Sequence, residues 1–68
     1  MYNVYYYISM KDKELLKLLL KNGWVVARIR GSHYRLEKEG FKPITLPIHG
    51  DDMGKGLETA ILKQAGLK

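Results

Sequence analysis

Three short segments with the alternating pattern of β-strands follow one another in the middle of the chain, and turn-forming pairs separate them. The segments are "WVVARIR" (24–30), "HYRLEK" (33–38) and "KPITLPIH" (42–49). Gly31-Ser32 and Glu39-Gly40 join them, and such pairs are typical of turns between strands. The pattern predicts a three-stranded antiparallel sheet. The third segment holds two prolines, which lack an amide donor, so we expect it at a sheet edge.

The alternation also assigns side chains to the two faces of this sheet. One face is predicted to be apolar and to face the core, with Val25, Ala27, Ile29, Tyr34, Leu36, Ile44, Leu46 and Ile48. The other face is predicted to be open to solvent, with Arg28, Arg30, His33, Arg35, Glu37, Thr45 and His49, and with Trp24 and Val26 beside the first two arginines. A mostly cationic open face with two histidines is therefore expected.

Helical patterns flank the three strands. In the first, Ser9 is expected to cap a helix in a capping box with Asp12, three residues further on. This helix carries a leucine stripe and a separate lysine stripe, and Gly23 is expected to end it. The leucines are Leu15, Leu16, Leu19 and Leu20, and the lysines are Lys13, Lys17 and Lys21. In the second, Gly56 is expected to cap a helix that ends at Gly66. Its apolar face is predicted to hold Leu57, Ala60, Ile61 and Ala65.

The order of elements predicts an α+β domain, α-β-β-β-α, with both helices on the apolar face of the sheet. A chain of 68 residues suits one such domain. The remaining N-terminal segment, "MYNVYYYIS" (1–9), has strong β preference. It is interpreted either as a short extra strand or frayed arm, or as an arm on which bases or a partner stack.

The charge and the absence of cysteine narrow the class of partner. The net charge is +5, from 12 Lys and Arg against 7 Asp and Glu, which favours a polyanionic or acidic partner: nucleic acid, an acidic protein or an anionic membrane surface. With no cysteine, disulfides and cysteine-based zinc sites are excluded, and a reducing compartment fits. No apolar run approaches the ~20 residues that span a bilayer, so a cytoplasmic protein is expected.

His33, within "RIRGSHYRLEKEG" (28–40), admits three interpretations. It could complete the turn as a structural residue. As a metal ligand it lacks companions, because no H-x-x-x-H or H-E-x-x-H spacing occurs, so no metal site is expected. As an acid–base group it titrates near neutral pH, and nearby arginines would favour the neutral imidazole, which accepts a proton. The same arginines would hold a phosphate, as metal-free RNA cleavage through the 2′-hydroxyl requires. Ser32 is adjacent, but neighbouring strand residues point to opposite faces, so it is not expected to be a nucleophile activated by His33.

Four stretches together carry a family resemblance: "KELLKLLLKNGW", "RIRGSH", "ITLPIHG" and "ILKQAGL". In this order and at these spacings, across residues 10–67, they resemble the HicA toxins of bacterial toxin–antitoxin systems. Members of that family usually begin near the position of Met10, so residues 1–9 are interpreted either as an N-terminal extension or as preceding a natural start at Met10. The family often has a second histidine or other polar residue after G-S-H, where this chain has Tyr34.

The resemblance implies a fold similar to the double-stranded-RNA-binding domain and a metal-independent ribonuclease that cuts mRNA, with no cofactor. It implies that the histidine of G-S-H, here His33, is catalytic, and that a HicB-type antitoxin binds and inhibits the chain. Candidate RNA ligands are Arg28, Arg30, Arg35 and Lys55, the last expected just before a helix N-terminus, which favours anions. Ser32 and His49 are candidate auxiliary residues.

Two other functions stay open at this point. A non-catalytic RNA-binding module of the same fold would use the lysine stripe and the loop before the second helix. A protein-interaction domain would use its basic surface for an acidic partner. Among these features, the placement of G-S-H alone favours the nuclease over both.

Overall fold

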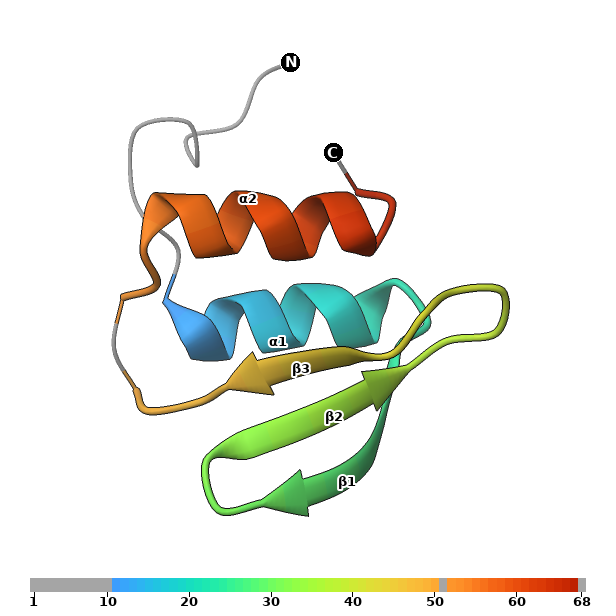
Figure 1. Cartoon of the computed structure of the whole chain (residues 1–68), viewed down its shortest axis with the longest axis horizontal. Helices are drawn as coiled ribbons and strands as arrows, with labels where there is room; N and C mark the ends of the chain where they lie inside the picture. The colour runs from blue at the N-terminus through green and yellow to red at the C-terminus, as the bar shows by residue number, and fades with distance from the viewer. Residues whose placement is uncertain (1–10, 51, 68) are drawn as a thin grey trace.

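The computed structural model of the chain describes residues 11–50 and 52–67, and it confirms the predicted order of elements (Figure 1). The elements are α1 (Asp12–Lys21), β1 (Val25–Arg30), β2 (His33–Glu37), β3 (Ile44–Pro47) and α2 (Lys55–Gln64). The three strands form one antiparallel sheet in the order β1-β2-β3. Strand β3 is therefore an edge strand, as its prolines predicted.

A two-residue turn joins β1 to β2, because Arg30 pairs directly with His33 across the hairpin. Gly31, the first turn residue, has φ +61°, whereas Ser32 does not have a positive φ. A positive φ at the first central position alone is the pattern of a type II′ turn, which suits the twist of a hairpin and favours glycine there. Gly31 and Ser32 of the G-S-H motif thus form the tight turn, and His33 starts β2.

A β-bulge in β1 corrects part of the predicted facing. Val26 pairs with Leu36, but the next pair is Arg28 with Arg35, so Ala27 is the extra residue. An extra residue reverses the faces of everything before it. Val25 therefore shares the open face with the arginines, Val26 lies on the helix side and Trp24 is buried in the core. The opposite assignment for these three residues was wrong.

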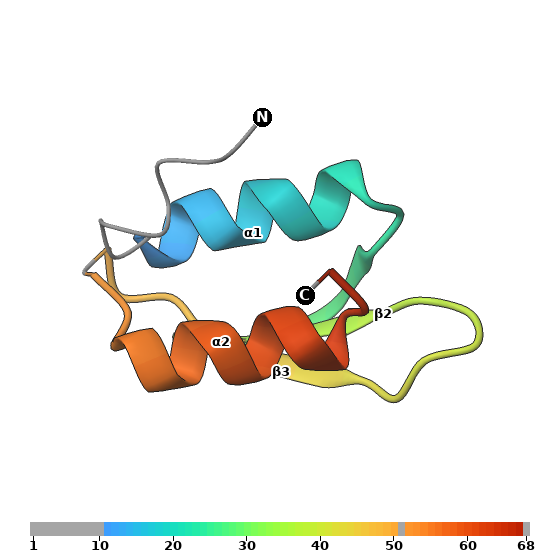
Figure 2. The same ribbon diagram turned by 90° about the horizontal axis from the view of Figure 1, so that it is seen from above.

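Both helices lie side by side over one face of the sheet, as predicted (Figures 1 and 2). They cover β2 and β3 and enclose the core: Leu15, Leu19, Trp24, Leu36, Ile44, Leu46, Met53, Ile61, Leu62 and Ala65. Every residue of β1 is exposed. Val25 and Ile29 are 58% and 56% exposed, so the expected inward role of β1 residues was wrong, because the helices do not reach over this strand.

Both helices begin at positions other than those expected. Helix α1 begins at Asp12 with Lys11 as N-cap, whose amide donates to Glu14 Oε1 at 3.2 Å. The predicted cap, Ser9, lies outside the described residues. Helix α2 begins at Lys55 after Gly54, so Gly56 lies within the helix rather than at its cap.

The buried face of α2 also differs from the prediction. Glu58, Ile61 and Leu62 are buried, whereas Leu57 is 45% exposed and Ala60 is exposed. Positions 58, 61, 62 and 65 satisfy helical spacing as well as the predicted set does. The carboxylate at Glu58 masked this alternative, because a charged residue is rarely buried.

The loop between β2 and β3 closes the end of the molecule away from the β1–β2 turn. Lys38 Nζ donates to the backbone oxygen of Asn22 at 2.7 Å, which caps α1. The same ammonium lies 5.1 Å from the centroid of the Phe41 ring, and that ring lies 5.4 Å from Trp24. These contacts of Lys38 and Phe41 therefore hold the β2–β3 loop against the C-terminal end of α1 and against Trp24.

Candidate functional site

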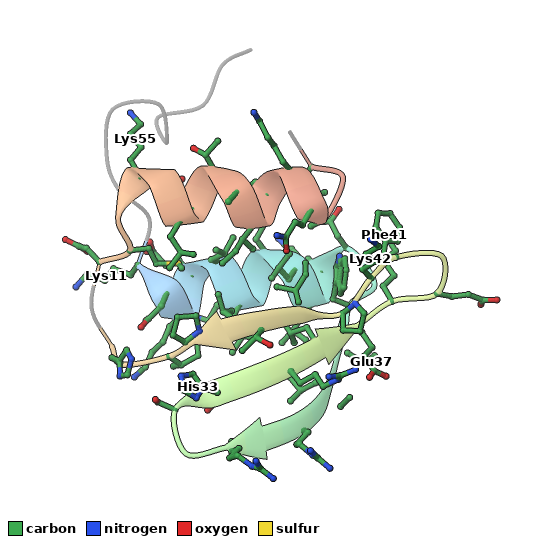
Figure 3. All side chains as sticks on the ribbon, viewed as in Figure 1. Lys11, His33, Glu37, Phe41, Lys42 and Lys55 are labelled. Carbon is green, nitrogen blue, oxygen red and sulfur yellow. The ribbon has the colours of Figure 1, made fainter. Side chains whose placement is uncertain are left out.

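His33 is the first residue of the central strand, on the open face of the sheet. It pairs with Arg30 of β1 on one side and with Pro47 of β3 on the other. The side chain is exposed, and Figure 3 shows it at the turn end of β2. The backbone of His33 is therefore held by two neighbouring strands, while its ring is accessible to a large substrate.

Three arginines surround His33 on the same face. The register places Arg28 opposite Arg35 and Arg30 opposite His33, and directly opposite side chains lie about 4.5–5.5 Å apart at Cβ. The predicted grouping of these four residues on the open face is confirmed. Like charges directly opposite each other destabilise a sheet. This grouping does not serve folding, and it suits the binding of an anion.

Glu37 partly compensates one of these arginines. Its Oε2 lies 3.0 Å from Arg35 Nε, and the two side chains are 48% and 50% exposed. Exposed ion pairs contribute at most about 1 kcal/mol, so the carboxylate holds Arg35 only weakly. Beside this pair lies an open hollow of ≈ 330 Å³, lined by Ala27, Arg28, Arg35 and Glu37. The bulged residue thus helps to shape the surface between two of the arginines.

The two candidate auxiliary residues lie on the segments next to His33. Ser32 is half-buried in the turn, and its backbone oxygen accepts a hydrogen bond from Ile48 N at 2.7 Å. His49 is exposed in the chain that follows β3, and its backbone amide donates to Asp12 Oδ2 at 2.6 Å. Both are therefore placed through the backbone. Tyr34 pairs with Ile29 on the helix side of the sheet, so the position after His33 does not face the open side.

Lys55 lies apart from the other predicted RNA ligands. It is the first residue of α2 rather than a residue before the helix. Figure 3 shows its side chain in the helical layer, pointing away from the sheet. The structure therefore brings together His33 and the three arginines, and it leaves Lys55 outside that group.

Sequence reasoning overlooked Asp12 as part of this region. Its side chain is 2% exposed, and Oδ2 accepts the amides of both His49 and Gly50. The residue was interpreted as the acidic member of a capping box with Ser9. A signal was present, because Asp12 is in helical phase with Leu15 and Leu19, and a carboxylate aligned with a buried stripe needs internal partners.

Neither a metal cluster nor a membrane-spanning helix was found in the part of the chain that the structure describes. Within 11–50 and 52–67, no group of at least three His, Cys, Asp or Glu side chains could hold a metal ion. In the same ranges, the helices are too short or too polar to cross a membrane.

Three comparisons with known proteins agree with one another on the family of this chain. A sequence model described as the HicA toxin of bacterial toxin–antitoxin systems matches residues 13–67. The chain is 38% identical over 60 residues to a protein of Pseudomonas fluorescens (strain Pf0-1) named "Probable mRNA interferase HicA", covering 87% of this chain and 98% of that protein. Its fold is similar to a chain in a toxin–antitoxin complex from Streptococcus pneumoniae, with a TM-score of 0.74, 44% identity, and coverage of 85% of this chain and 98% of the other.

Proposed function

Because the chain belongs to the HicA toxin family, we propose that it is the toxin of a toxin–antitoxin pair and acts as an endoribonuclease on mRNA. The name of the Pseudomonas relative supports the activity, and the Streptococcus complex supports the pairing. The observation that carries the proposal is the position of His33 in the central strand, beside arginines on an open face.

In the proposed reaction, His33 acts as a general base. The imidazole takes the proton of a 2′-hydroxyl, and the resulting oxygen attacks the adjacent phosphorus, which displaces the 5′ oxygen of the next nucleotide. The departing 5′ oxygen takes a proton from water, and His33 returns its own proton to the solvent. The products are a 2′,3′-cyclic phosphate and a 5′-hydroxyl.

The role of the arginines in this mechanism is to bind the phosphate. Arg30 and Arg35 flank His33 across and along the sheet, and Arg28 extends the cationic surface. Planar guanidinium groups bind phosphate through two parallel hydrogen bonds and stabilise charge that develops on its oxygens. Lys55 would contact a more distant part of a long RNA, because it lies in the helical layer.

The test is cleavage of a long mRNA by purified protein in the presence of EDTA. We expect wild type to cleave, because the proposed groups need no metal, and His33→Ala to lose cleavage. Truncation of an exposed side chain of this kind costs less than about 0.5 kcal/mol of stability, so circular dichroism should report the same fold for the variant. Lys42→Ala is the matched control, since Lys42 lies at the opposite end of the molecule from His33 (Figure 3).

Three outcomes would change the conclusion. Full activity of His33→Ala would remove the histidine from the mechanism. Loss of activity in EDTA that a divalent ion restores would replace imidazole catalysis with metal catalysis. Salt-sensitive RNA binding without cleavage would favour the non-catalytic RNA-binding module, and absence of both would favour a protein-interaction domain.

The partner in this proposal is a HicB-type antitoxin that covers the open face. The cationic group around His33 predicts an acidic surface on the inhibitor, because complementary charge speeds encounter and fixes orientation. Hydrogen exchange of the complex should therefore show protection of β1 and of the start of β2 by the antitoxin. Protection confined to the helical layer, with His33 still accessible, would contradict inhibition by occlusion.

A further inference from the structure

The N-terminus of α1 is bonded to the loop that follows β3. Asp12 is buried, and its Oδ2 accepts the backbone amides of His49 at 2.6 Å and of Gly50 at 2.9 Å. Hydrogen bonds from amides to a carboxylate are shorter and about twice as strong as neutral ones. This one oxygen therefore fixes two successive peptide groups of a segment that is 37 residues away in sequence from Asp12.

The same loop is bonded at its other end to the strand that carries His33. Pro47 pairs with His33 in the β2–β3 ladder. Ile48 N donates to the backbone oxygen of Ser32, the residue before His33, at 2.7 Å. Residues 47–50 are therefore fixed against the His33 end of the sheet on one side and against α1 on the other.

We infer that Asp12 is a positioning residue, which acts through the 47–50 segment to hold the turn end of β2 in the geometry that catalysis needs. This inference rests on the proposed ribonuclease function. Its physical basis is that misplacement of a reacting group by about 1 Å can cost ~100-fold in rate. Without Asp12, the two amides lose their acceptor, and the segment that packs beside Ser32 and His33 is released at one end.

The distinguishing experiment separates kcat from KM. For Asp12→Ala, we expect kcat for RNA cleavage to fall by about 10- to 100-fold, with KM little changed because the three arginines remain in place. For Asp12→Asn, we expect kcat within about threefold of wild type, since both amides donate to one oxygen and the carboxamide oxygen can replace it.

Glu14→Ala is the matched control. This substitution removes a carboxylate from the same helical turn, together with the hydrogen bond that it accepts from Lys11 N. That hydrogen bond stays at the start of α1 and does not reach the 47–50 segment. All variants are assayed well below their melting temperatures, so that each is folded. An equal fall of kcat in Glu14→Ala would assign the effect to helix destabilisation and would overturn the inference, as would wild-type kcat in Asp12→Ala.

A second measurement does not depend on RNA cleavage. Amide hydrogen exchange should be slow at His49 and Gly50 in wild type and Asp12→Asn, and fast in Asp12→Ala. Unchanged protection in Asp12→Ala would refute the anchoring itself. If wild type does not cleave RNA, the proposed function is wrong, but the exchange rates at His49 and Gly50 still test whether Asp12 holds the 47–50 segment. If Asp12→Ala does not fold, Asp12→Ser replaces it with the same expected results, because its hydroxyl ends short of the loop amides.

Discussion

Replacement of Arg28 by glutamine should make the fold more stable and the binding of RNA weaker. Arg28 lies directly opposite Arg35 on the open face, and both side chains are exposed. A directly opposite pair contributes between about 0.2 and 1 kcal/mol, with an unfavourable sign for like charges. Taking ~0.5 kcal/mol for this pair, Arg28→Gln should raise the melting temperature of a domain this small by about 2–4 °C at low salt.

The effect on RNA should have the opposite sign. Removing one cation that binds a phosphate of single-stranded RNA reduces the slope of log K against log salt by about 0.7. Arg28→Gln should therefore weaken binding at low salt and flatten the salt dependence by about this amount. Thermal unfolding and fluorescence titration with a short RNA, each at several salt concentrations, measure the two effects.

Lys17→Gln is the control for this experiment. It removes the same charge from an exposed position on α1, in the helical layer. We expect no gain in melting temperature and little change in the salt slope. The gain in Arg28→Gln should also disappear at 1 M salt, where charges are screened beyond ~3 Å. If Arg28→Gln is no more stable than wild type at low salt, repulsion between Arg28 and Arg35 does not destabilise the sheet. If both variants flatten the salt slope equally, the grouping of cations on the open face is not what binds RNA.

Three further predictions concern single residues. Glu37→Gln should release Arg35 and tighten RNA binding by about two- to fivefold, since an exposed ion pair is worth at most ~1 kcal/mol; unchanged affinity in the same titration would mean that Arg35 does not contact phosphate. Gly31→Ala should cost about 1–2 kcal/mol in urea denaturation, because an alanine is strained at φ +61°, and an unchanged stability would argue against the type II′ turn. Val25→Thr should change the free energy of unfolding by less than about 0.5 kcal/mol, whereas Leu36→Ala should cost about 2–5 kcal/mol; comparable losses would mean that β1 is covered in solution.

Sequence reasoning reached the fold through features that depend on local chemistry. Gly31-Ser32 between two alternating segments specifies a hairpin, and the pairing of that hairpin places His33 beside Arg30 without any knowledge of the rest of the chain. The leucine stripe of α1 likewise predicted the burial of Leu15 and Leu19, although Leu20 of the same stripe is 44% exposed.

The features that were missed depend on tertiary context. The bulge at Ala27 shows in the sequence only as Trp24 and Val26 on the predicted cationic face, and this blurred alternation does not specify where an extra residue lies. Burial of Asp12 is stabilised by amides from a loop that is distant in sequence. The helical phase of Asp12 with the buried leucines indicated burial, but no local pattern identifies those partners. Lys55 was grouped with the arginines because of its charge and its expected place before a helix N-terminus, and only the layer order separates it from them.

The exposure of β1 means that part of the proposed site sits on the element that detaches most easily. Arg28 and Arg30 belong to a strand that buries none of its own side chains, whereas His33 and Arg35 belong to a strand anchored in the core by Leu36. Regions with few buried contacts open at lower free energy than the molecule as a whole. Local unfolding that begins at β1 would thus separate Arg28 and Arg30 from His33 while the helices and the β2–β3 ladder persist. On heating, RNA cleavage would therefore be lost before the helical signal.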